Sequence, residues 1–195
     1  MFEPTFSLER ARSVLGADRV IAMLRAMKKA LDHYNGLSPE VTIAFDPSLT
    51  AHFLNRQWYQ SAKQEMADMG GVTFDDHNSQ WFVRFDQEAI VRHKKFDGQL
   101  RSRNFPALHN RRWLTPQLSF EEIPDVGRLQ FGYRLDATER VMKDAFITLP
   151  AKGSNLWVWQ IWGEPIETFG IPLPLRSKPV RADEIYWYDD FSQVV

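Results

Sequence analysis

An alternation of apolar and polar residues near the middle of the chain constrains the fold more than any other feature. Its apolar members are Leu129, Phe131, Tyr133 and Leu135. Successive side chains of a strand point to opposite faces, so this pattern predicts a strand with one face in the core. The turn-forming sequence DATE follows, then a returning strand over residues 141–149, a second turn PAKGS and the apolar run NLWVWQIW. The order predicts an antiparallel β-meander.

The third strand of this meander is apolar on both faces. Trp157, Trp159 and Trp162 dominate it, and such a strand is expected inside a sheet or under helices. A ligand pocket lined by the tryptophans is a less favoured alternative to core packing. Arg128 and Arg134 alternate with the apolar residues of the first strand. They are therefore expected on the opposite face, either extending a basic surface or pairing with Asp144.

The first 70 residues read mainly as helices. Ser7 is expected to cap a short helix that ends near Leu15, and Asp18 a longer one. The longer helix is expected to stop at residues 35–36, Asn-Gly, since both residues tolerate the left-handed conformation.

A strand and a further helix are expected next. The β-branched sequence VTIAF, residues 41–45, follows a proline and predicts a strand. Pro47 then suits the first turn of another helix, where a missing amide costs little. Gly70 and Gly71 are expected to end that helix.

The remaining pattern completes an α+β fold. Strands are expected at residues 72–74, 80–85 and 88–93, the first two joined by the turn DDHNS. We expect one domain over residues 1–195, with N-terminal helices packed on a mainly antiparallel sheet. Its parts are a helical region (1–70), a β-rich region (72–162) that ends in the meander, and a proline-rich acidic tail (163–195).

Several function classes lack their motifs. Cysteine is absent, which excludes disulfides, thiolate metal sites and cysteine nucleophiles. The chain has no phosphate-binding glycine loop, no dinucleotide fingerprint, no HExxH and no nucleophile elbow. Asp75, Asp76 and His77 can bind a divalent cation, but a polar turn explains them better. No metal or cofactor is therefore expected.

A cytoplasmic protein is the simplest expectation for the cellular compartment. The N-terminus has no secretory signal, and Glu3 and Glu9 disfavour a transit peptide. No apolar run approaches the length that spans a bilayer.

One strongly basic stretch stands out in a chain whose overall charge is −1. Its sequence from Ile90 is IVRHKKFDGQLRSRNFPALHNRRW, and beyond Lys94 it shows no clear period, so a long irregular loop is expected. Arginine and lysine neutralise phosphates, and aromatic rings stack on unpaired bases. The candidate nucleic-acid-binding residues are Arg92, Lys94, Lys95, Arg101, Arg103, Arg111, Arg112, Phe105 and Trp113. A solvated loop, or one paired with the acidic tail, is the competing interpretation.

Two histidines, His93 and His109, bracket this stretch. Imidazoles close to arginines can act as base and acid in metal-independent RNA cleavage, with arginine stabilising the developing phosphate charge. They are the candidate catalytic residues, although two histidines also occur near arginines by chance. The sequence leaves open whether the chain is an enzyme.

The sequence VRHKKFDGQLRSRNFPALHN, followed by GRLQFGYRLDATERVMKDAFITLP, resembles a group of uncharacterised bacterial proteins of about this length. The resemblance covers roughly Val91 to Trp159. Such proteins are encoded beside helix-turn-helix regulators, as in toxin–antitoxin or mobile-element modules. The resemblance implies a helix-turn-helix protein partner and a regulatory or defence setting, and it implies no catalytic residues.

These observations favour a bacterial intracellular toxin-like or regulatory module that contacts RNA or DNA through residues 92–112. One alternative is a protein-interaction module whose basic loop docks on an acidic partner surface or on the tail sequence DEIYWYDDF. The other alternative is a metal-independent nuclease.

Overall fold

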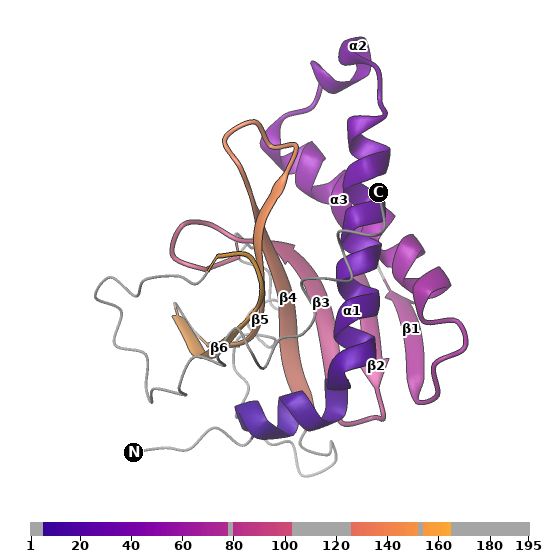
Figure 1. Cartoon of the computed structure of the whole chain (residues 1–195), viewed down its shortest axis with the longest axis vertical. Coiled ribbons are helices and arrows are strands. Elements are labelled where there is room, and N and C mark those ends of the chain that lie inside the picture. The colour runs from indigo at the N-terminus through magenta and orange to yellow at the C-terminus, as the bar shows by residue number, and fades with distance from the viewer. Residues whose placement is uncertain (1–5, 78–79, 103–125, 152–153, 165–195) are drawn as a thin grey trace.

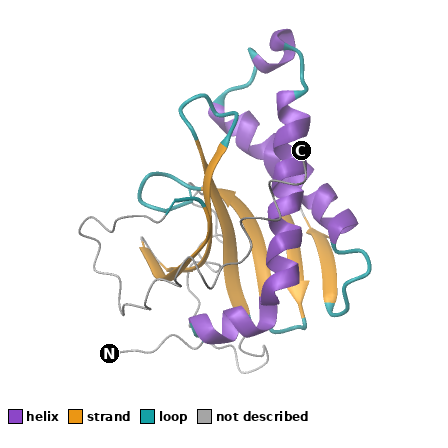
Figure 2. Cartoon of the chain, viewed as in Figure 1, coloured by secondary structure: helices purple, strands orange, loops and turns teal. Residues whose placement is uncertain are grey.

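The computed structural model describes residues 6–77, 80–102, 126–151 and 154–164. Its helices are α1 (Leu8–Asn35), α2 (Pro39–Thr42) and α3 (Pro47–Glu65). Its strands are β1 (Val72–His77), β2 (Gln80–Phe85), β3 (Ala89–Lys95), β4 (Gly127–Leu135), β5 (Met142–Ala151) and β6 (Ser154–Trp162). Helices come first and strands follow (Figures 1 and 2), which confirms the α+β class and the C-terminal meander.

The strands form one six-stranded sheet in chain order, from β1 to β6. All neighbouring pairs are antiparallel except β3 and β4, which run parallel with Ala89 opposite Gly127 and Lys95 opposite Tyr133. The sheet therefore consists of two three-stranded meanders, β1–β3 and β4–β6, joined along one parallel seam. The hairpin between β4 and β5 projects toward α2 (Figure 1), and Asn35 Nδ2 donates a hydrogen bond to the carbonyl of Arg140 there.

One hydrophobic core lies between the helices and one face of the sheet. Alternate residues of the central strands enter it, among them Val91, Leu129, Phe131 and Ile147, all fully buried. Trp58 of α3 is fully buried there as well, and its indole Nε1 donates to the carbonyl of Met23 on α1 at 3.1 Å. Burial of these side chains is the main stabilising term of the fold.

The helices follow local signals, with two differences. Ser7 caps α1, as predicted, by accepting a hydrogen bond from the amide of Arg10 at 3.1 Å. The predicted break lies at Gly16, whose φ of 58° interrupts α1, rather than at Asp18. The helix ends at Gly36 as expected, but with a right-handed φ of −78°, so the left-handed cap predicted there is wrong.

The strand predicted at residues 41–45 is wrong. Ser38 and Pro39 start the short helix α2 instead, and the amides of Val41 and Ile43 donate to the carbonyls of Ser38 and Pro39. Ile43 is 87% exposed, so its β-branched side chain gains no packing that would favour a strand.

Two further positions differ from expectation. Asp75 and His77 belong to β1 rather than to a turn. The tryptophan-rich strand β6 is at the edge of the sheet, not inside it. The start of α1 covers part of it, since Trp157 Nε1 donates to the carbonyl of Phe6 at 2.9 Å and the Arg12 guanidinium lies over the Trp159 ring. None of the helices that the structure describes is long and apolar enough to cross a membrane.

Candidate nucleic-acid interface

The start of the basic stretch is a strand rather than a loop. Arg92, His93, Lys94 and Lys95 all belong to β3, in the centre of the sheet. Since side chains alternate along a strand, Arg92 and Lys94 point away from the helices, whereas His93 points into the core. The stretch therefore presents its charges on two sides of the sheet rather than on one flexible loop.

A polar row crosses the sheet on the side away from the helices. Arg92 of β3 lies opposite Gln130 of β4, which lies opposite Thr148 of β5. Directly paired residues of neighbouring strands share a face, with their Cβ atoms about 5 Å apart. All three side chains are buried, and neither Gln130 Nε2 nor Thr148 Oγ1 has a hydrogen-bond partner. A buried polar atom without a partner is unusual and calls for an explanation.

Positive charge is in excess on this side, which we call the basic face. Its described cations are Arg84, Arg92, Lys94, Arg128 and Arg134. The carboxylates at its described strand positions are Asp75 and Asp144, and each pairs with an arginine of the same face.

The pair between Arg134 and Asp144 is the one that the sequence offered as an alternative. It is bidentate, with Arg134 Nε donating to Asp144 Oδ1 at 2.8 Å. The basic face thus keeps net positive charge along β3 and β4.

Burial makes the two β3 cations costly to keep charged. It lowers the pKa of Arg92 to about 10, and burial together with the nearby charge of Arg92 lowers the pKa of Lys94 to about 8. Arg92 also lies over the ring of Phe82, 5.3 Å from its centroid. A bound anion would offset the cost of holding both charges in this position.

Aromatic side chains flank the row. Phe96 and Phe146 are buried outside the main core, with ring centroids 6.5 Å apart. Phe96 lies directly over Gly132, where a Cβ atom would come within 1.9 Å of its ring. This close approach fixes the end of β3 against β4.

Two other predicted contact residues pair with carboxylates of this chain. Lys95 Nζ forms an ion pair with Glu139 in the β4–β5 turn. Arg101 pairs with Asp97 at 3.1 Å in the tight turn that follows Phe96. Both are less available to an external phosphate than Lys94.

His93 lies in the core. It is 1% exposed and stacks between Trp58 and Tyr133, with both centroid distances 4.7 Å. Its Nε2 is 3.2 Å from Met27 Sδ, and its Nδ1 has no partner. Burial, and secondarily the charge of Lys94, holds the pKa of His93 well below its usual value of 6.5. These surroundings argue against proton transfer between His93 and a substrate.

The other predicted contact and catalytic residues lie outside the described residues. They are Arg103, Phe105, His109, Arg111, Arg112 and Trp113. The tail sequence DEIYWYDDF lies outside them too. Gln130 and Thr148 were missed as candidates, although Gln130 was visible as a polar position of the alternating pattern.

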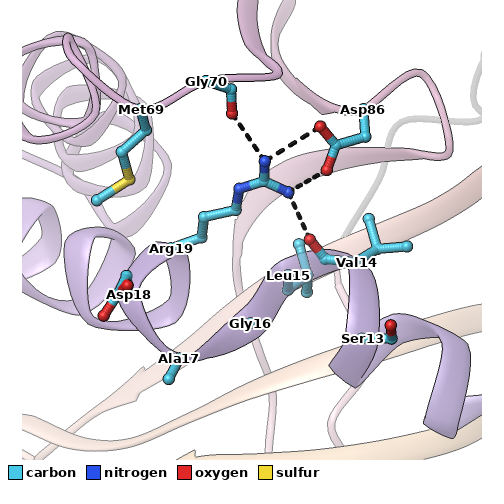
Figure 3. A pocket seen from close by; sticks show the side chains of 10 residues that line it. All are labelled: Ser13, Val14, Leu15, Gly16, Ala17, Asp18, Arg19, Met69, Gly70 and Asp86. Atoms are coloured by element: carbon cyan, nitrogen blue, oxygen red, sulfur yellow. Dashed lines mark hydrogen bonds and ion pairs between the residues drawn. The ribbon is translucent and has the colours of Figure 1, made fainter.

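A separate hollow of about 450 Å³ opens where α1 breaks, between Gly16 and residues Met69 and Gly70. Arg19 occupies its centre (Figure 3), donating to the carbonyls of Val14 and Gly70 and pairing with Asp86. The side chain ties the helix break, the α3–β1 connection and the β2–β3 turn together. Its donors already have acceptors in this chain, so we assign the hollow a structural role.

Among the described residues, no three histidine or acidic side chains gather as a metal site would require. Comparison of the chain with protein-family models, curated proteins and solved structures found no match.

Proposed function

We propose that this chain binds nucleic acid through the basic face, as a toxin-like or regulatory module of bacterial origin. The observation that carries the proposal is the pair Arg92 and Lys94, which lie on one face of the central strand beside unpartnered polar atoms of Gln130 and Thr148. Cations that neutralise phosphates supply most sequence-independent affinity for nucleic acid. Residues 103–113 would extend this surface. The resemblance of Val91–Trp159 supports a helix-turn-helix protein as partner.

Adjacent lysines give a matched test. Lys94 lies on the basic face, whereas Lys95 pairs with Glu139 and points the other way. Anisotropy titrations of labelled single-stranded RNA and DNA over a range of salt concentrations would measure affinity. Lys94→Met should weaken binding and reduce the slope of log K against log salt by about 0.7 to 0.9, the loss of one phosphate contact. Lys95→Met should leave both nearly unchanged. Equal effects of the two variants, or no binding at low salt, would refute the proposal.

A protein-interaction module is the second candidate. Lys95 and Arg101 already bind carboxylates of this chain, so the basic stretch suits an acidic protein surface or the chain's own tail. Deletion of residues 183–195 distinguishes the two ideas. Nucleic-acid binding that tightens on deletion supports a tail that competes for the basic face. Unchanged binding shows that the tail does not shield it.

The nuclease alternative has weaker support, because one of its two histidines is buried in the core. Incubating labelled RNA and DNA with the protein, with and without EDTA, would test it. Substrate left intact in both conditions would end this alternative.

A further inference from the structure

We infer that the polar row on β3, β4 and β5 is a site for a single phosphate monoester, formed by Arg92, Lys94, Gln130 and Thr148. The inference rests on the proposed function, since it concerns the same face of the sheet. It goes further by naming the chemical group that the face recognises: a terminal phosphate rather than the phosphodiester backbone.

The available groups of the row are hydrogen-bond donors. Arginine and lysine carry donors and no acceptor. The unpartnered atom of Gln130 is its amide nitrogen, and the Thr148 hydroxyl can donate. A ligand that satisfies these groups together must present several acceptor oxygens. Its negative charge must also match an arginine and a lysine. A phosphate monoester, with up to two negative charges and three terminal oxygens, fits this description.

The register brings the donors to one place. Arg92, Gln130 and Thr148 are direct neighbours across three adjacent strands. Lys94 is opposite Gly132, two residues further along β3. Since Gly132 has no side chain, nothing from β4 stands between Lys94 and the row. Arg134, the next cation on β4, is already held by Asp144, so it closes the site rather than contributing to it.

Burial selects a small ligand over an extended chain. Gln130 is 2% exposed, Thr148 is fully buried and Arg92 is 7% exposed. Lys94 is only partly buried, so the row is reached past this lysine. A continuous backbone would have to expose its neighbouring sugars and bases to this buried row. A chain end, or a free phosphorylated small molecule, presents one phosphate alone.

Orphaned polar atoms could instead be a cost that the fold tolerates, and one substitution separates the two cases. Thr148→Val keeps the shape of the side chain and removes a hydroxyl that has no partner. It should not lower the melting temperature of the free protein, because replacing an unsatisfied polar group by an apolar one is neutral or stabilising. If the row binds phosphate, the same variant should lose about tenfold in phosphate affinity.

The test uses calorimetric titration of the full chain with inorganic phosphate. It also compares a short oligonucleotide carrying a 5′-phosphate with the same oligonucleotide carrying a 5′-hydroxyl. We expect phosphate to bind, the 5′-phosphorylated strand to bind at least about tenfold tighter than the hydroxyl form, and Thr148→Val and Lys94→Met to remove the difference. Lys143→Met is the control, because Lys143 is exposed on β5 outside the row.

The outcomes separate this inference from the proposed function. Equal binding of both oligonucleotides, with no binding of inorganic phosphate, overturns the phosphate site and leaves nucleic-acid binding standing. Phosphate binding that Thr148→Val weakens, with no affinity for either oligonucleotide, supports the site and assigns it to a phosphorylated small molecule. Phosphate binding that Thr148→Val and Lys94→Met both leave unchanged overturns the site.

Discussion

Replacing His93 with phenylalanine should reduce the loss of folding stability in mild acid. The imidazole is 1% exposed, stacks on aromatic rings and leaves Nδ1 without an acceptor. Burial holds its pKa well below 6.5 in the folded chain. Below pH 6.5 the unfolded chain therefore takes up a proton that the folded chain refuses. The stability present above that pH is lost as the pH falls toward the folded pKa.

The magnitude follows from linkage. Each pKa unit corresponds to about 1.4 kcal/mol, so at about pH 5 the wild type should have lost about 2 kcal/mol of unfolding free energy through His93 alone, if the folded imidazole is still neutral there. Phenylalanine cannot titrate, and it keeps an aromatic ring between Trp58 and Tyr133. The pH-dependent difference between the two proteins is the quantity to measure, because a change of packing shifts the variant equally at every pH.

Urea denaturation followed by tryptophan fluorescence, at a series of pH values from about 7.5 to about 5, would measure it. His33 is exposed on α1 and hydrogen-bonds Gln57 at 3.0 Å, so His33→Phe is the matched control and should follow the wild-type curve. Parallel pH curves for the wild type and His93→Phe would show that solvent or an unrecognised acceptor reaches the imidazole, which would refute the burial argument.

Two further substitutions test the framework that holds the sheet and helices together. Arg19→Leu should lower the unfolding free energy by about 2 kcal/mol, because it removes an ion pair and leaves two carbonyls without their donor; urea denaturation should show Lys28→Ala, at an exposed pair on α1, costing less than about 0.5 kcal/mol. Gly132→Ala should lower the melting temperature by several degrees, about 1 to 3 kcal/mol, because the new Cβ meets the Phe96 ring, whereas Gly70→Ala, which meets nothing within 4 Å, should have a much smaller effect.

The meander was predictable because its signal is local. Alternation along β4 and the turn DATE fix which residues of β4 and β5 face each other, and the observed pairing of Arg134 with Asp144 follows from that register. The position of β6 at the sheet edge was not local information. A strand that is apolar on both faces suits the interior of a sheet equally well, and only the path of the N-terminal residues shows that Phe6 and Arg12 cover it.

The candidate site was predictable in its chemistry and not in its geometry. Sequence identified Arg92 and Lys94 as cations near aromatic residues, but it placed Lys94 in a loop. Parity along the strand would have assigned His93 to the core, since it shares the parity of Val91. The link from Arg92 to Gln130 and Thr148 depends on the parallel seam. The register of that seam is set by packing between residues far apart in the sequence, which no local pattern reports.

The parallel seam also has a consequence for how the basic face comes into existence. Each three-stranded meander contains mostly local contacts and can form early, whereas the seam closes only after the long connection between β3 and β4 has returned along the sheet. Arg92 belongs to the first meander, and Gln130 and Thr148 belong to the second. Neither half alone holds the polar row. Any recognition that depends on it is therefore confined to molecules whose two halves have docked, and a partially folded chain would be inert toward the same ligand.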